Sequence, residues 1–295
     1  MDDLGTIVPD RPVVIGGPTA CGKSALALRI ARTQGGVIVN ADALQIWSCW
    51  RILSARPSPQ DEADIPHLLY GHKHPGDAYS VGHWLRDLAP ILAAFKNGGP
   101  RPIIIGGTGL YLSALTEGLA DIPPTPAAIR QEADAIRDRD GHLVMAQALD
   151  PQTAARVDLK NPMRVQRAWE VQRATGRGLA HWQDDTPPPL LPLDHCQALV
   201  IDADRDWLAT RIDRRFDIML KTGAVEEVQQ ILPIWDRDAL WAKAIGAPEI
   251  VAMLRGEISA STAREQAQAA TRQYAKRQRT WFRARLKKWQ KIPRP

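Results

Sequence analysis

Four short apolar runs alternate with helix-like segments, three of them early in the chain and one late. The runs cover residues 12–15, 36–40, 102–105 and 198–202. They are rich in β-branched residues and show no polar alternation, which is typical of strands buried on both faces. Residues 24–31 are strongly helix-forming and residues 81–97 have an amphipathic period. This alternation predicts an α/β fold with a parallel sheet covered by helices.

The pattern changes after Gly118. A proline-rich stretch over 121–126 is followed by helical periodicity over 127–182, with almost no strand signal. A second group of prolines, between residues 187 and 192, ends this stretch, and only helices are expected after the strand at 198–202. We therefore expect an α/β core made of 1–120 and 197–295, interrupted by a helical insertion domain over 121–196.

A glycine-rich loop joins the first predicted strand to the first predicted helix. It fits the pattern G-x-x-x-x-G-K-[ST] through Gly17, Pro18, Thr19, Ala20, Cys21, Gly22, Lys23 and Ser24. In this strand–loop–helix context the pattern predicts a P-loop, whose amides surround phosphate oxygens at a helix N-terminus. Lys23 would add a positive charge and the Ser24 hydroxyl a ligand for Mg²⁺. The core is therefore expected to be P-loop NTPase-like, although the motif alone leaves a kinase or an NTPase open.

Polar residues follow two other predicted strands. Asp42 follows the second strand and Thr108 the third, and ligands of open parallel sheets lie at such carboxyl ends. From position alone Asp42 could be a catalytic group, a helix cap or a Mg²⁺ ligand, and Thr108 a turn residue. The third strand ends in Gly-Gly-Thr-Gly without the Walker-B aspartate of a typical NTPase, which weakens the ATPase interpretation.

Charge adds one further expectation. The chain of 295 residues carries a net charge of +5, and its basic residues concentrate over 272–288, including Lys276 and Arg277. A basic helix here could offer phosphate contacts on one face and pack its aromatic residues on the other, or simply be solvated. The absence of a long apolar run, a secretory signal and paired cysteines predicts a cytoplasmic protein with no membrane contact, disulfide or cysteine zinc site.

Several short motifs follow the P-loop in an order that is typical of one protein family. After the P-loop come Asn40-Ala41-Asp42-Ala43-Leu44-Gln45, Ile65-Pro66-His67, Gly106-Gly107-Thr108-Gly109-Leu110-Tyr111, Ala244-Ile245-Gly246 and a block from Thr271 to Gln278. The chain resembles the bacterial type of the tRNA dimethylallyltransferase (tRNA isopentenyltransferase) family from about residue 12 to 285. The resemblance implies transfer of the dimethylallyl group of dimethylallyl diphosphate to the exocyclic amine of adenosine 37, beside the tRNA anticodon.

The resemblance also assigns roles. Asp42 is expected to be the general base, and Thr108 to lie near the reacting centre. The P-loop with Lys23, Arg211, Arg215 and a Mg²⁺ ion would hold diphosphate as the leaving group. The co-substrate would be dimethylallyl diphosphate, the partner the anticodon stem-loop of tRNA, and the enzyme a monomer.

Contacts to tRNA are implied for a larger set. Arg164 and Arg167 share one face of a helix predicted over 163–174, although a solvated basic face is the alternative. The implied set is Asp42, Ala43, Leu44, Gln45, Thr108, Arg130, Arg164, Arg167, Lys276 and Arg277. The target base must leave the stacked loop to reach a buried carbon.

The sequence departs from the family at two places. Ala43-Leu44 stands where Ser-Met is usual, and Ala247-Pro248 where Tyr-Lys is common, so contacts of those side chains are not expected. The remaining alternatives are an adenylate isopentenyltransferase, which uses free nucleotides, a P-loop small-molecule kinase, and a non-catalytic RNA-binding module.

Overall fold

The computed structural model describes residues 7–294, which form two compact units. The core unit combines the residues up to Thr116 with those from Leu190 onward, and the helical unit is Glu117–Pro189. The predicted insertion, 121–196, overlaps the helical unit, and its standing as a separate domain remains a prediction. Residues 190–196 of the predicted insertion belong to the core unit, where Leu191 is buried and donates its N–H to the Leu115 carbonyl at 3.0 Å.

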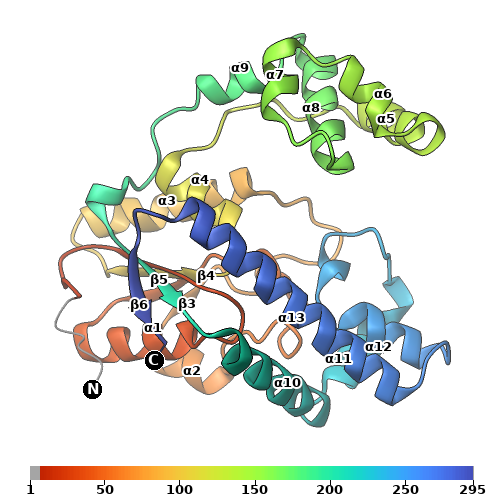
Figure 1. Ribbon diagram of the computed structural model, residues 1–295. Helices are drawn as coiled ribbons and strands as arrows, with labels where there is room; N and C mark the ends of the chain where they lie inside the picture. The colour runs from red at the N-terminus through yellow and green to blue at the C-terminus, as the bar shows by residue number, and fades with distance from the viewer. Residues whose placement is uncertain (1–6, 295) are drawn as a thin grey trace. The chain divides into compact units, whose positions relative to one another are not determined.

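Within residues 7–294, the core unit is built on a six-stranded parallel sheet with the order β3-β2-β4-β1-β5-β6 (Figure 1). All its strand pairs are parallel, as the alternation of apolar runs and helices predicts. The strands are β1 (Val13–Gly16), β2 (Val37–Asn40), β3 (His67–Leu68), β4 (Pro102–Gly106), β5 (Gln197–Asp202) and β6 (Gln290–Pro293).

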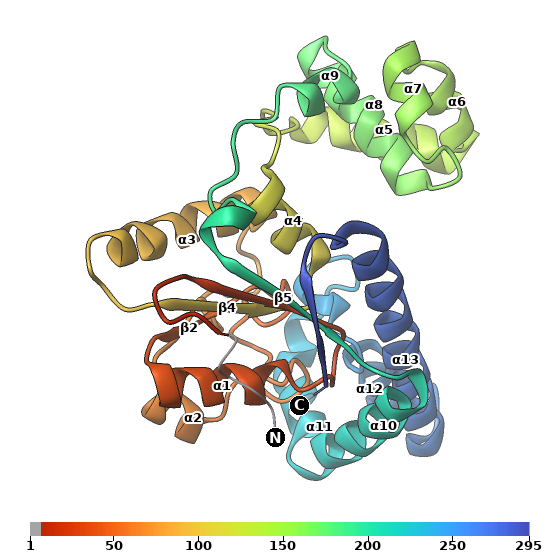
Figure 2. The same cartoon turned by 60° about the vertical axis from the view of Figure 1, so that its left-hand side comes forward.

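Helices cover both faces of the sheet. Val13 and Ile15 belong to one buried cluster, with helix α1 (Lys23–Gln34), and Val14 to a second cluster, with helices α3 (Val81–Lys96) and α4 (Gly109–Glu117). Figure 2 shows α1 on one side of the strands and α3 and α4 on the other. Successive residues of a strand point to opposite faces, so strands buried on both sides need an unbroken apolar sequence.

The core unit contains the predicted helices and others that the sequence did not single out. They are α1 (Lys23–Gln34), α2 (Pro59–Asp64), α3 (Val81–Lys96), α4 (Gly109–Glu117), α10 (Arg205–Lys221), α11 (Ala224–Ile231), α12 (Ala247–Leu254) and α13 (Ala260–Arg285), with 3₁₀ turns η2 (Leu193–His195), η3 (Leu232–Ile234) and η4 (Trp241–Lys243). The predicted helices over 24–31 and 81–97 are confirmed. The long α13 packs against α10 and α12 (Figure 1).

The helical unit consists of short helices. They are α5 (Ala127–Asp140), α6 (His142–Gln147), α7 (Pro151–Arg156), α8 (Pro162–Thr175) and α9 (Leu179–Asp184). A small core of Ala133, Met145 and Val165 joins α5, α6 and α8. The buried amide of Gln166 adds a polar link, because it accepts from Arg137 at 2.6 Å and donates to Asp134 at 2.9 Å.

Two features differ from the sequence prediction. Helices were expected to continue to the C-terminus, and this is wrong: α13 ends at Arg285, and β6 then pairs in parallel with β5. The strand signal is weak because β6 is an edge strand with exposed polar positions, and only Ile292 is partly buried. The two-residue β3 was too short to be recognised. No helix in the described part of the chain has both the length and the apolar character needed to cross a membrane.

Candidate active site

The sheet creates a crevice at the carboxyl ends of its central strands. The neighbouring strands β1 and β4 are followed by α1 and α4, which lie on opposite faces. The segment after β2 touches the end of β4, because Ala41 N–H donates to the Ile105 carbonyl at 2.7 Å. A Cβ at Gly106 would lie 2.0 Å from the Ala41 oxygen, so only glycine permits this approach. The contact brings Asp42 close to the Gly106–Gly109 loop.

The P-loop has the backbone of an anion site. Ala20 and Gly22 both have positive φ, 63° and 99°, which turns successive N–H groups toward one concave surface. The Lys23 ammonium donates to the carbonyls of Gly17 and Pro18, each at 2.8 Å. From α10, Arg211 Nε donates to the Ala20 carbonyl at 3.0 Å. The loop is therefore held in place by its own lysine and by an arginine from a distant helix.

Asp42 is oriented by its neighbours. The buried Asn40 side chain accepts from Asp42 N–H at 2.8 Å and donates to the Asp42 carbonyl at 3.0 Å. The Asp42 carboxylate accepts from Leu44 N–H at 2.9 Å through Oδ1. Thr108 Oγ1 accepts from Ala43 N–H at 2.9 Å. The Thr108 hydroxyl thus stabilises the turn that carries Asp42. The second carboxylate oxygen of Asp42, Oδ2, remains available to a ligand in the cavity.

One cavity of about 510 Å³ joins these groups. The predicted site residues that line it are Thr19, Ala20, Cys21, Gly22, Lys23, Ser24, Asp42, Leu44, Gln45, Arg211 and Arg215. Gly17, Pro18, Ala43 and Thr108 are outside this lining, although Thr108 contacts the Asp42 turn as described. The structure therefore brings a phosphate cradle, one carboxylate and three arginines to the same cavity, the third being Arg214, which the sequence did not single out.

The negative charge of Asp42 shifts the pKa of several neighbouring side chains. Burial raises the pKa of Tyr70, of Tyr111 and of Tyr274, and the negative charge of Asp42 raises each further. Burial lowers the pKa of Arg215, while Asp42 acts in the opposite direction. An arginine remains cationic in proteins, so a partly desolvated Arg215 favours a bound anion.

Gln278 is a site residue that sequence reasoning missed. It is buried on α13, accepts from Thr19 N–H at 2.8 Å and donates to the Gly107 carbonyl at 2.9 Å. It therefore ties the P-loop to the loop that follows β4. A signal was present, because Gln278 lies at helical spacing between the buried Ala275 and Phe282.

The orientation of Gln45 is also determined. Its amide nitrogen donates to the carbonyls of Ser54 and Ala55, both at 2.9 Å. Because both partners are acceptors, the NH₂ group must face them. The Gln45 oxygen is then left as an acceptor at the cavity.

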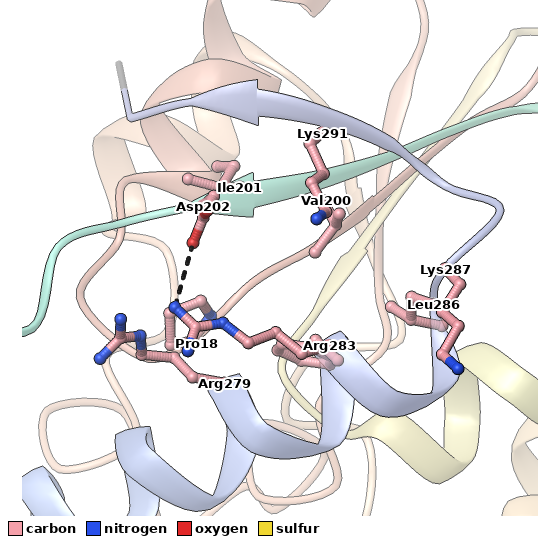
Figure 3. Close-up of a pocket in the computed structure, with 10 residues that line it drawn as sticks. Pro18, Val200, Ile201, Asp202, Arg279, Arg283, Leu286, Lys287 and Lys291 are labelled. Carbon is pink, nitrogen blue, oxygen red and sulfur yellow. Dashed lines mark ion pairs between the residues drawn. The ribbon is translucent and has the colours of Figure 1, made fainter.

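A second, smaller cavity of about 120 Å³ is lined in part by Pro18 and lies between α13 and the strands β5 and β6 (Figure 3). Asp202 and Arg283 face each other across it, 4.0 Å apart. Its remaining cations are Arg279, Lys287 and Lys291. Basic residues thus extend along α13 beyond the predicted Lys276 and Arg277, which are both exposed.

The other predicted RNA contacts belong to the helical unit. Arg167 donates to the Thr125 hydroxyl at 2.6 Å and lies 3.9 Å from the Glu170 carboxylate. Burial lowers the pKa of Arg167, Glu170 acts in the opposite direction, and the positive charge of Arg130 lowers it further. Arg164 is 64% exposed and lies 3.7 Å from Asp158. Arg167 thus has partners within the helical unit, whereas the Arg164 side chain is largely exposed.

The protein oxygens near the P-loop suit Mg²⁺. Among residues 7–294, no group of three or more histidine, cysteine, aspartate or glutamate side chains could hold a metal. The cavity offers the Ser24 hydroxyl and the Asp42 carboxylate. Mg²⁺ typically takes one or two protein oxygens and completes its shell with phosphate and water, so this sparse set fits it.

Comparisons with known proteins agree with this geometry. The IPP transferase family model matches residues 45–285. The chain is 60% identical to a tRNA dimethylallyltransferase of Dinoroseobacter shibae, over 99% of this chain and 98% of the relative, and 59% identical to one of Cereibacter sphaeroides, over 100% and 93%. It is similar in structure to the full-length tRNA isopentenylpyrophosphate transferase of Bacillus halodurans, with a TM-score of 0.68 and 28% identity over 96% of this chain and 90% of that one. The P-loop fold expected from the sequence is thereby confirmed, and the chain belongs to the tRNA dimethylallyltransferase family.

Proposed function

We propose that the chain transfers the dimethylallyl group from dimethylallyl diphosphate to the exocyclic amine of adenosine 37 in tRNA and releases diphosphate. The observation that carries the proposal is the single cavity in which the P-loop, Arg211 and Arg215 lie with the Asp42 carboxylate. The cations and backbone amides can bind the negatively charged diphosphate, and the carboxylate can accept a proton from the amine. We further propose that it acts as a monomer in the cytoplasm, as the family resemblance implies.

The P-loop would hold a leaving group in this reaction. As the carbon–oxygen bond breaks, negative charge builds on the diphosphate, and the loop amides, Lys23, Arg211 and Arg215 stabilise it. Lys23 would exchange its two loop carbonyls for phosphate oxygens. A Mg²⁺ ion held by Ser24 would supply further positive charge to the diphosphate.

Asp42 is positioned to accept the proton. The adenine amine becomes acidic as its bond to carbon forms, and a nearby carboxylate then removes the proton. Asn40 and Leu44 fix the turn and one carboxylate oxygen, which leaves the other for the amine. Thr108 accepts from Ala43 and also contacts the hydroxyl of Tyr274, which lines the cavity, so it supports the turn that carries Asp42 from outside the lining.

Apolar side chains complete the cavity. Leu53, Phe216, Met219 and Ile245 line it together with the charged groups. A five-carbon prenyl chain is hydrophobic, so this wall suits the tail of the donor and excludes water from the reacting carbon.

RNA would be held by the basic residues outside the cavity. Lys276 and Arg277 on α13 are exposed, as are Arg130 and Arg164 in the helical unit. Such side chains contact phosphates in a salt-dependent manner. The acceptor oxygen of Gln45 and the Asp42–Leu44 turn would receive the target adenine.

The test is a comparison of acceptors. With labelled dimethylallyl diphosphate and Mg²⁺, we expect transfer to an anticodon stem-loop that has adenosine at position 37, none to AMP, and no transfer after chelation of Mg²⁺. Transfer to AMP in preference to RNA would favour an adenylate isopentenyltransferase. Steady ATP turnover with a small acceptor, and no labelled RNA, would favour a P-loop kinase and refute the proposal.

A further inference from the structure

Glu227 on α11 makes an unusual set of contacts. Its Oε1 accepts from the backbone N–H groups of Arg51 at 2.6 Å and Ile52 at 2.9 Å. Its Oε2 accepts from Leu53 N–H at 2.9 Å. A carboxylate that binds three successive amides is a strong, charge-assisted clamp on that backbone. Glu227 itself does not line the cavity.

The clamped segment is part of the cavity wall. Leu53, Ser54 and Ala55 all line the cavity. Ala55 has a φ of 52°, a conformation that costs energy for a residue with a side chain and persists only where neighbours hold it. Gln45 holds this segment from the other side through the carbonyls of Ser54 and Ala55.

The Leu53 side chain meets two other elements at Gly246. A Cβ placed on Gly246 would lie 3.1 Å from Leu53 Cδ2 and 2.8 Å from Phe216 Cε2. Leu53 is buried and closes the apolar part of the cavity together with Phe216 and Ile245. A shift of the 51–55 segment would therefore open this part of the wall and leave the P-loop untouched.

We propose that Glu227 is a positioning residue that fixes the 51–55 segment and thereby restricts the donor to a short prenyl chain. The inference rests on the proposed function, because it takes the donor to be a prenyl diphosphate. Glu227 acts through Leu53 and makes no contact with the reacting atoms.

The experiment uses the full chain with Glu227→Gln and Glu227→Ala, and Glu226→Gln as the matched control. Glu226 is the adjacent carboxylate on α11, is exposed, and makes none of the three amide contacts. In Glu227→Gln the new NH₂ group must face at least one backbone N–H, so the clamp is broken while the size is kept. Three properties are measured: KM for dimethylallyl diphosphate, inhibition by inorganic diphosphate, and the ratio of kcat/KM for dimethylallyl over geranyl diphosphate.

We expect Glu227→Gln, which gives up at least one of the three amide contacts, to raise KM for the five-carbon donor by about tenfold, and Glu227→Ala, which gives up all three, to raise it by at least that factor. The preference for five over ten carbons should fall by a similar factor, while inhibition by inorganic diphosphate stays at the wild-type level. Glu226→Gln should match wild type in all three.

Two results would overturn the inference. One is a Glu227→Ala enzyme with wild-type KM and chain-length preference. The other is an equal loss of donor and inorganic diphosphate binding, since this would mean general damage to the fold. A wild-type enzyme that transfers no prenyl group would instead refute the proposed function, so the two failures can be told apart.

Discussion

Gln278→Ala tests the link between the P-loop and the loop after β4. The change removes both side-chain hydrogen bonds and leaves Thr19 N–H and the Gly107 carbonyl without their partner. An unpartnered buried group costs about 1–3 kcal/mol, and the half-buried Thr19 amide lies at the low end of this range, so the free energy of unfolding should fall by roughly 2–4 kcal/mol. That is a large share of a typical stability of about 5–15 kcal/mol, but it leaves the chain folded at room temperature.

The melting temperature should therefore fall by on the order of 5–15 °C, measured by circular dichroism or calorimetry. Because Thr19 belongs to the P-loop, the variant should also bind inorganic diphosphate more weakly. Gln273→Ala, at an exposed glutamine of the same helix, is the control and should change the free energy of unfolding by less than about 0.5 kcal/mol. A Gln278→Ala protein that melts within 2 °C of wild type, roughly the effect of a surface substitution, and binds diphosphate equally well would refute this reasoning.

Three further predictions concern charge. Arg215→Ala should weaken inhibition by inorganic diphosphate by about 10- to 100-fold, the loss of one charged hydrogen bond, and unchanged inhibition would argue against its role. Arg164→Ala and Arg167→Ala should each weaken stem-loop binding and reduce the slope of log affinity against log salt concentration by about one. The control is Arg139→Ala, which alters an exposed arginine paired with Asp140 and should leave both quantities unchanged. Burial raises the pKa of Cys49 to about 12 and that of Cys196 to about 11. Because the thiolate is the reactive form, a thiol reagent should label both cysteines slowly at pH 8 and faster as the pH rises. The free energy of unfolding should fall from about pH 9 upward, because the thiols then ionise in the unfolded chain before they ionise in the folded one. Fast labelling of the native protein at pH 8 would contradict this.

The sequence predicts those parts of the structure that depend on local pattern. Continuous apolar runs identified four of the strands, and the glycine pattern located the P-loop between β1 and α1. β6 escaped prediction because its exposed edge needs no apolar sequence, and only pairing with β5 makes it a strand.

Contacts between distant residues could not be read from the sequence. Gln278 reaches Thr19 across 259 positions, and Glu227 reaches Leu53 across 174. A buried glutamine at helical spacing signals a partner, but it does not say which one. The orientation of Asp42 likewise depends on Asn40 and on the approach of two strand ends at Gly106.

The most direct test of the central claim is prenyl transfer by wild type and Asp42→Asn in the same assay. Asparagine can keep the Oδ1 contact with Leu44 N–H, so the turn and diphosphate binding should persist while the base is lost. The account predicts label on the amine of adenosine 37, one diphosphate released per prenyl group transferred, and a rate about 10²- to 10⁴-fold lower for Asp42→Asn. An Asp42→Asn enzyme that transfers the label at the wild-type rate, or label found elsewhere than on that amine, would contradict it.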